Sequence, residues 1–127
     1  MEKIENQISY DVRQAIFKVY NSLGPGLFES VYETALSYEI EKFGYNVKRQ
    51  VALPFVYEEI KFEQGFRIDI LVEDKVIIEL KSVEALTDVH YKQVLTYLKL
   101  SDKKLGILVN FNSDHISNNI KRIVNNL

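Results

Sequence analysis

Cysteine is absent from the 127 residues of this sequence. Without it the chain can form no disulfide, thiolate zinc site or iron–sulfur cluster, and it has no thiol nucleophile. Long apolar runs are absent as well, since no segment approaches the ~20 apolar residues of a membrane helix. The first residues, MEKIENQISYDV, lack the apolar core of a secretory signal peptide. We therefore expect a cytoplasmic protein that does not enter a membrane.

An excess of basic residues is also missing. Lys and Arg number 16 against 18 Asp and Glu, which gives a net charge of −2. A protein that holds DNA through non-specific phosphate contacts is usually basic. Contact with nucleic acid would therefore need a bound cation, a partner or local basic pairs. Lys48-Arg49, Lys103-Lys104 and Lys121-Arg122 are such pairs, although a solvated surface explains each one more simply.

The spacing of apolar residues divides a single predicted domain, residues 1–127, into helices and strands. Helical periodicity predicts helices over about 4–23, 28–43, 87–100 and 116–127. Alternation and β-branched runs predict strands over about 47–53, 56–62, 66–72, 76–81 and 105–111. The division of residues 47–62 stays open, because Pro54 interrupts the alternation. The order α-α-β-β-β-β-α-β-α predicts an α/β (α+β) fold with a mixed β-sheet flanked by helices.

Charged residues interrupt two of these apolar strands. Asp69 lies inside the 66–72 strand, and Glu79 and Lys81 lie inside the 76–81 strand. An ionised side chain in a desolvated place is costly unless it is paired or binds a metal. For so short a pattern an ion pair with Lys81 is the simpler explanation, whereas the position within apolar strands favours a functional site.

The turn between the two strands decides whether the acids meet. A three-residue turn at 73–75 would pair Val72 with Val76 and place Asp69 opposite Glu79, with Cβ atoms about 5 Å apart. Two carboxylates that close raise each other's pKa unless a cation lies between them. A two-residue turn would instead put the acids on opposite faces. Oxygen ligands without soft ones predict Mg²⁺ or Mn²⁺ as cofactor.

Two motifs resemble a known superfamily. Asp69 followed by Glu79-Leu80-Lys81 resembles the PD-(D/E)xK nuclease motif, with Ile68 in place of the proline. Gly26-Leu27-Phe28-Glu29-Ser30-Val31-Tyr32 is similar to the G-x-x-E-x-x-Y signature of the GxxExxY protein family, which is assigned to the same superfamily. The resemblance continues to residues 108–111 and covers nearly the whole chain. It implies a restriction-endonuclease-like core.

The resemblance also implies a set of site residues. Asp69, Glu79 and Lys81 would be catalytic, and Glu29, Asp69, Glu79 and the Leu80 carbonyl would hold the metal. For Glu29 the alternative is an acid favoured by the helix dipole in a first turn.

A third motif lies in the predicted helix after the site. Gln93-Val94-Leu95-Thr96-Tyr97 resembles the Q-x-x-x-Y motif of RecB-type exonucleases. Gln93 and Tyr97 share a helix face with His90, apart from the apolar stripe, and we predict that they support substrate binding. The alternatives are packing for Gln93 and Tyr97 and an exposed helix position for His90.

The function predicted from these patterns is a Mg²⁺- or Mn²⁺-dependent nuclease that hydrolyses DNA phosphodiester bonds. The alternative is a non-catalytic nuclease-fold module that binds nucleic acid or a protein partner. A homodimer is compatible with both. The sequence contains no G-x-x-x-x-G-K-[ST] loop, H-E-x-x-H helix or G-x-S-x-G elbow, which argues against other phosphate enzymes and serine hydrolases.

Overall fold

The computed structural model describes residues 4–127, except the side chains of residues 63 and 64. In chain order the elements are α1 (Ile4–Leu23), α2 (Glu29–Glu41), β1 (Val47–Tyr57), β2 (Ile60–Val72), β3 (Val76–Lys81), α3 (Asp88–Ser101), β4 (Leu105–Asn110), the 3₁₀ turn η1 (Ile116–Asn119) and β5 (Ile120–Val124). The strands form a five-stranded sheet in the order β1-β2-β3-β4-β5. Strands β3 and β4 run parallel, and the other neighbouring pairs run antiparallel.

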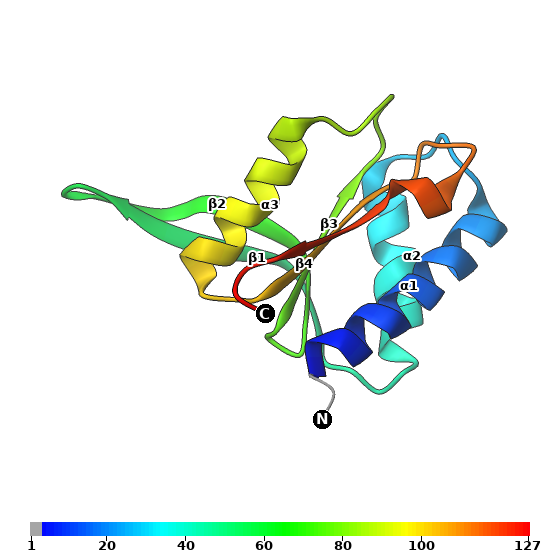
Figure 1. The fold of residues 1–127 in the computed structure, drawn as a ribbon, viewed down its shortest axis with the longest axis horizontal. Coiled ribbons are helices and arrows are strands. Elements are labelled where there is room, and N and C mark those ends of the chain that lie inside the picture. Colours follow the sequence, from blue (N-terminus) through cyan, green and yellow to red (C-terminus); the bar gives the residue numbers. More distant parts are fainter. Residues whose placement is uncertain (1–3) are drawn as a thin grey trace.

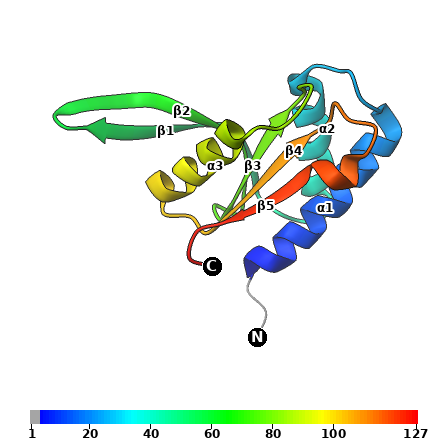
Figure 2. The same cartoon turned by 45° about the horizontal axis from the view of Figure 1, so that its top comes forward.

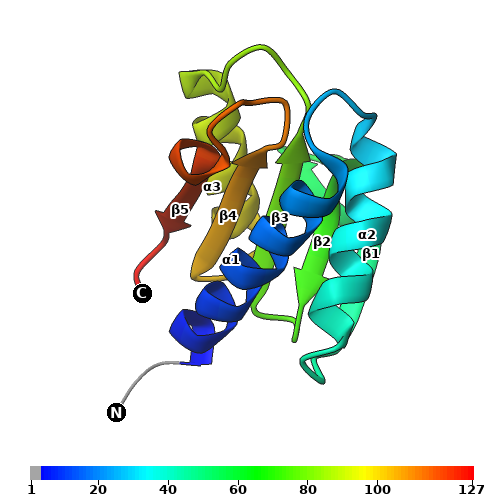
Figure 3. The ribbon, with the colours of Figure 1, turned by 90° about the vertical axis from the view of Figure 1, so that its right-hand side faces the viewer.

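Helices cover both faces of the sheet, which confirms the predicted α+β class with a mixed sheet flanked by helices. Helices α1 and α2 lie on the face turned toward the viewer in Figure 3, and α3 lies on the other face. Each face has its own apolar cluster, one packed against α1 and α2 and the other against α3. None of the helices within residues 4–127 combines the length and apolarity that crossing a bilayer requires.

The first helix follows its predicted stripe. Its buried residues are Ile8, Val12, Ala15, Ile16 and Val19. The helix ends before Gly24, whose φ of +70° suits glycine best. Helix α2 begins at Glu29, and this first residue contacts Ser82, directly after β3.

The segment predicted as three strands over 47–72 forms two long strands. Strands β1 and β2 pair up to Tyr57 and Ile60, and the turn between them takes residues 58–59. Pro54 lies within β1, an edge strand, where the missing N–H is tolerated. The distal part of this hairpin projects beyond the body of the sheet as an arm (Figures 1 and 2).

Aromatic stacking stabilises the arm. The Phe55 and Phe62 rings stack with centroids 4.5 Å apart, and the Phe66 ring lies 5.0 Å from that of Phe55. Gly65 makes room for this stack, because a Cβ atom there would come within 2.0 Å of the Phe55 ring. Through Phe66, which packs with the cluster under α3, this stack joins the base of the arm to the body of the domain.

The predicted closing helix over 116–127 is wrong. Residues 116–119 form one 3₁₀ turn, and β5 then pairs antiparallel with β4. Ile120 packs with the cluster under α1 and α2, whereas Ile123 packs with the cluster under α3. The isoleucines whose spacing resembles a helical stripe thus belong to one 3₁₀ turn and one strand. The strand contributes side chains to both faces of the sheet, and β-branched residues favour strands.

Candidate active site

The turn after β2 sets the register that the sequence predicts. Val72 pairs with Val76, so residues 73–75 form a three-residue turn. This confirms the three-residue turn on which the predicted facing of Asp69 and Glu79 depends, and the regular pairing ends one residue short of the two acids.

Side chains replace the regular strand pairing at this point. The last paired residues are Ile70 and Ile78. Beyond them the Asp69 N–H donates to Glu79 Oε1 at 3.1 Å, and the Leu80 N–H donates to Asp69 Oδ2 at 2.9 Å. Each acid therefore holds the backbone of the opposite strand, and the strands open into a fork around the two carboxylates.

Strand β2 also changes face at Asp69. Ile70 packs with the cluster under α1 and α2, but Ile68, two residues earlier, packs with the cluster under α3. The unbroken alternation predicted over 66–72 is therefore wrong. On β1 the neighbouring residue, Gln50, has a φ of +51°, and the pairing register passes over Gln50 and Asp69. The acid lies at a local irregularity of both strands.

Burial raises the pKa of both acids. Glu79 is 3% exposed, and its burial, followed by the charge of Asp69, raises its pKa to about 9. Burial also raises the pKa of Asp69, and the charge of Glu33 adds to this rise, although the Leu80 N–H opposes it. The two acids thus share a poorly hydrated place where ionising both is unfavourable, which is the condition that a bound cation relieves.

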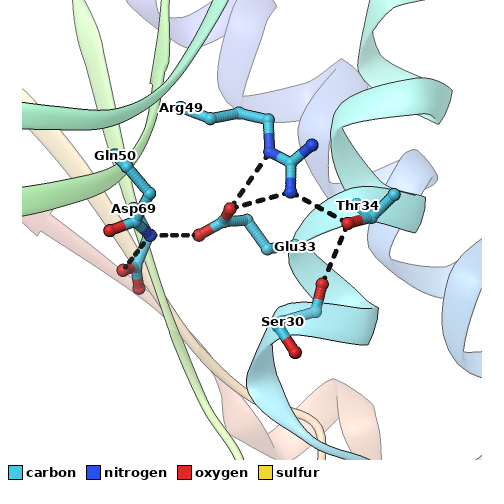
Figure 4. A network of polar contacts seen from close by, with 6 residues as sticks. All are labelled: Ser30, Glu33, Thr34, Arg49, Gln50 and Asp69. Carbon is cyan, nitrogen blue, oxygen red and sulfur yellow. Dashed lines mark hydrogen bonds and ion pairs between the residues drawn. The ribbon is translucent and has the colours of Figure 1, made fainter.

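Two acids of α2 approach the fork from the other side. Glu29 begins α2, and its Oε1 accepts the Ser82 N–H at 3.3 Å. Glu33, one turn later, is buried and contacts the side chains of Arg49 and Gln50 (Figure 4). A cavity of about 440 Å³ is lined by Glu29, Ser30, Glu33, Gln50, Asp69 and Leu80.

Glu33 and Gln50 are absent from the residues predicted from sequence. The spacing of Glu33 four residues after Glu29 puts both acids on one face of α2, and this was the available signal. Nothing comparable marks Gln50, because its position depends on the irregularity in β1.

Tyr32 of the G-x-x-E-x-x-Y segment fastens the loop before α2. Its hydroxyl donates to the Gly24 carbonyl at 2.6 Å and accepts the Leu27 N–H at 3.1 Å. Its buried ring stacks on Phe111 with centroids 4.3 Å apart and the planes within 5°. The Tyr32 hydroxyl therefore holds the loop at Gly24 and at Leu27, which positions Glu29 at the start of the helix.

Asn110 fastens the segment that follows β3. Its side chain is fully buried, and its amide exchanges two hydrogen bonds with the backbone of Val83, at 3.0 and 2.9 Å. The Phe111 N–H donates to the Lys81 carbonyl at 3.0 Å. The end of β4 thereby holds the chain directly after Lys81, a role that the resemblance over residues 108–111 had not assigned to Asn110.

The predicted row on α3 is only partly polar. Lys81 Nζ donates to Gln93 Oε1 at 3.4 Å, so Gln93 reaches the site. Tyr97 is buried in the cluster under α3, where its ring lies 5.1 Å from that of Phe66, so its predicted position apart from the apolar stripe is wrong. Burial, then the charges of Glu79 and Asp69, raises the Tyr97 pKa to about 12. His90 Nδ1 accepts the Thr87 N–H at the start of the helix.

The available donors fit a hard divalent cation in kind. Carboxylates of Asp69, Glu79 and Glu29 and the Leu80 carbonyl are oxygen ligands of the type that Mg²⁺ and Mn²⁺ prefer. Among the described side chains of residues 4–127, no three His, Asp or Glu side chains lie close enough together to hold an ion without moving. Asp69 and Glu79 each bind the backbone of the other's strand, and Glu33 is separated from Asp69 by the Gln50 amide.

Comparison with known proteins gives one match. A family model described as the PD-(D/E)XK nuclease superfamily matches residues 6–123. No curated protein and no solved structure matches the chain.

Proposed function

The chain belongs to the PD-(D/E)XK nuclease superfamily, and from this premise we propose that it is a Mg²⁺- or Mn²⁺-dependent nuclease that hydrolyses DNA phosphodiester bonds. The restriction-endonuclease-like fold predicted from sequence agrees with the matched family and with the mixed sheet. The observation that carries the proposal is the fork at Asp69 and Glu79. These acids occupy opposed positions with raised pKa values, and Lys81 follows on the same strand.

The acids and one carbonyl would hold the ion. Asp69 and Glu79 supply carboxylates from the two strands of the fork, and Leu80 supplies its carbonyl. Glu29 supplies a third carboxylate from the first turn of α2, whose N-terminal end adjoins the cavity. When bound, such an ion polarises a phosphodiester and makes water a better nucleophile.

Lys81 would act on the attacking water and on the charge that develops at the phosphate. It lies two residues after Glu79 in β3, so both side chains leave the same face of the strand. A fixed positive charge at this place stabilises negative charge in the transition state. Gln93 accepts a hydrogen bond from Lys81 Nζ and would restrict the positions that this amine can take.

The test is a comparison of metal binding and DNA cleavage in two matched variants. Glu79→Gln keeps the size of the side chain and removes the charge, and Glu84→Gln makes the same change at an exposed residue. We expect the native protein and Glu84→Gln to bind Mn²⁺ in calorimetry and to cleave DNA. Glu79→Gln should do neither. Metal binding or cleavage by Glu79→Gln at the native level would overturn the proposal.

The arm favours a second candidate, a nuclease-fold module that binds a protein partner. Its tip exposes large apolar side chains, with Val56 61%, Tyr57 62% and Ile60 55% exposed. A module of this kind would need neither metal nor Glu79, so the same calorimetry separates the two candidates.

A further inference from the structure

The side-chain amide of Gln50 lies between two carboxylates. Its Nε2 donates to Glu33 Oε1 at 2.5 Å and to Asp69 Oδ1 at 3.4 Å. Figure 4 shows dashed lines from the amide nitrogen of Gln50 to the acid of α2 and to the acid of β2. The two hydrogens of this amide therefore point at two carboxylates. They place partial positive charge between these acids, where a bound cation would place a full charge.

Glu33 does not depend on this amide for its position. Arg49 Nε donates to Glu33 Oε2 at 3.0 Å, and the guanidinium also forms an ion pair with that oxygen. A second guanidinium nitrogen donates to Thr34 Oγ1 at 2.8 Å, which anchors Arg49 on α2. One carboxylate oxygen of Glu33 is thus held by a fixed cation, and the other, Oε1, points toward Asp69 across the Gln50 amide.

Gln50 is placed to move. The residue is exposed, and the pairing of β1 with β2 passes from Arg49 to Val51 without it. Its φ of +51° turns the side chain out of the regular alternation of the strand and over the cavity. Rotation of the side chain into solvent would break its two hydrogen bonds and leave the strand pairing unchanged.

We propose that Gln50 is a displaceable placeholder for the metal ion, and that Glu33 is a further carboxylate of the metal site. The inference rests on the proposed function and extends it to two residues outside the predicted ligand set. In the metal-free protein the Gln50 amide bridges Glu33 and Asp69 and offsets their repulsion. The amide would give way to a bound ion, for which Glu33 and Asp69 would supply carboxylate oxygens, while Arg49 keeps the Glu33 side chain aligned.

Calorimetric titration with Mn²⁺, together with thermal melting in the metal-free state, tests this inference. Gln50→Asn shortens the side chain by one methylene and suits the left-handed backbone, whereas Gln50→Ala removes the amide altogether. Gln14→Ala, at an exposed position of α1, is the matched control. Glu33→Gln tests the extra carboxylate, with Glu41→Gln at the exposed end of α2 as its control.

We expect both Gln50 variants to bind Mn²⁺ more tightly, by about tenfold, because the ion no longer has to break the hydrogen bonds of the bridge. Both should also melt at a lower temperature without metal, since the repulsion between Glu33 and Asp69 is then unrelieved. Glu33→Gln should weaken Mn²⁺ binding by about tenfold or more, as the loss of a charged ligand implies.

Three results would overturn the inference in distinguishable ways. Native affinity in both Gln50 variants would show that the amide does not compete with the ion. Weaker binding in both would make Gln50 a ligand or a structural support instead of a placeholder. In either case loss of binding in Glu79→Gln would leave the proposed nuclease function standing, whereas failure of the native protein to bind Mn²⁺ would overturn both.

Discussion

The backbone N–H of Asp69 donates to the carboxylate of Glu79, and the Asp69 carboxylate in turn accepts the N–H of Leu80. The two acids thus take the place of the strand pairing, whose last pair, Ile70 and Ile78, adjoins them. Asp69 and Glu79 therefore have two roles, because the carboxylates that end the pairing of β2 with β3 are also the proposed metal ligands.

The first prediction concerns pH. In the unfolded chain Glu79 loses its proton near pH 4.5, whereas burial and Asp69 raise its pKa in the folded protein to about 9. Between these values the folded protein binds more protons, so the free energy of unfolding of the metal-free protein should fall as pH rises and level off above about 9. Urea denaturation with a chelator present at pH 5, 7 and 9 measures this fall. Glu79→Gln should flatten the profile and Glu84→Gln should not, and an equally steep fall in Glu79→Gln would contradict the assignment.

The second prediction separates the role of Lys81 from that of the ligands. Lys81→Met removes the charge and keeps the length of the side chain, so Mn²⁺ affinity should stay close to native. DNA cleavage should fall by about a hundredfold or more, as expected when one group that stabilises transition-state charge is lost. Lys75→Met, in the exposed turn, should cleave normally. Cleavage by Lys81→Met at the rate of Lys75→Met would exclude the proposed role.

The third prediction concerns the hydroxyl of Tyr32. Tyr32→Phe removes the two hydrogen bonds to the loop before α2 and retains the ring stacked on Phe111. The free energy of unfolding should fall by about 1–2 kcal/mol, measured by urea denaturation. Mn²⁺ affinity should fall as well, because the loop positions Glu29. Tyr10→Phe, at a residue 62% exposed, is the control, and a loss no greater than in this control would mean that the ring alone anchors the loop.

The fourth prediction concerns the contact between α3 and β4. A Cβ atom on Gly106 would lie 2.7 Å from Val94 Cγ1. Gly106→Ala should therefore lower the free energy of unfolding by about 1–3 kcal/mol through overpacking.

A double-mutant cycle checks the cause of that loss. In the Val94→Ala background the added methyl group has room, so Gly106→Ala should be much less destabilising there. An equal loss in both backgrounds would place the strain elsewhere.

The fork was predictable from sequence because it depends on local chemistry. The turn at 73–75 sets the β2–β3 register as far as Ile70 and Ile78, and hydrogen bonds beyond that pair join Asp69 and Glu79 to the opposite strands. The helices over 4–23 and 87–100 were predictable for a similar reason, since each displays its apolar stripe within its own segment.

The parts that escaped prediction depend on contacts between distant segments. Glu33 and Gln50 meet only because α2 lies beside β1. The change of face at Asp69 is visible only in the tertiary packing, with Ile70 under α1 and α2 and Ile68 under α3. The wrong closing helix has the same origin. Its isoleucines fit a helical stripe, but the free edge of β4 takes up that segment as a strand.

The three-residue turn between β2 and β3 restricts how the length of this chain can vary. Deletion of one residue from 73–75 would send Asp69 to the opposite face from Glu79, because neighbouring strand positions point to opposite sides. Residues 58–59, at the tip of the arm, are under no such restriction, since added residues there lengthen a turn outside the sheet. Insertions between homologous chains, and peptide tags introduced by engineering, should therefore be accepted at the arm tip and rejected at the turn that sets the active site.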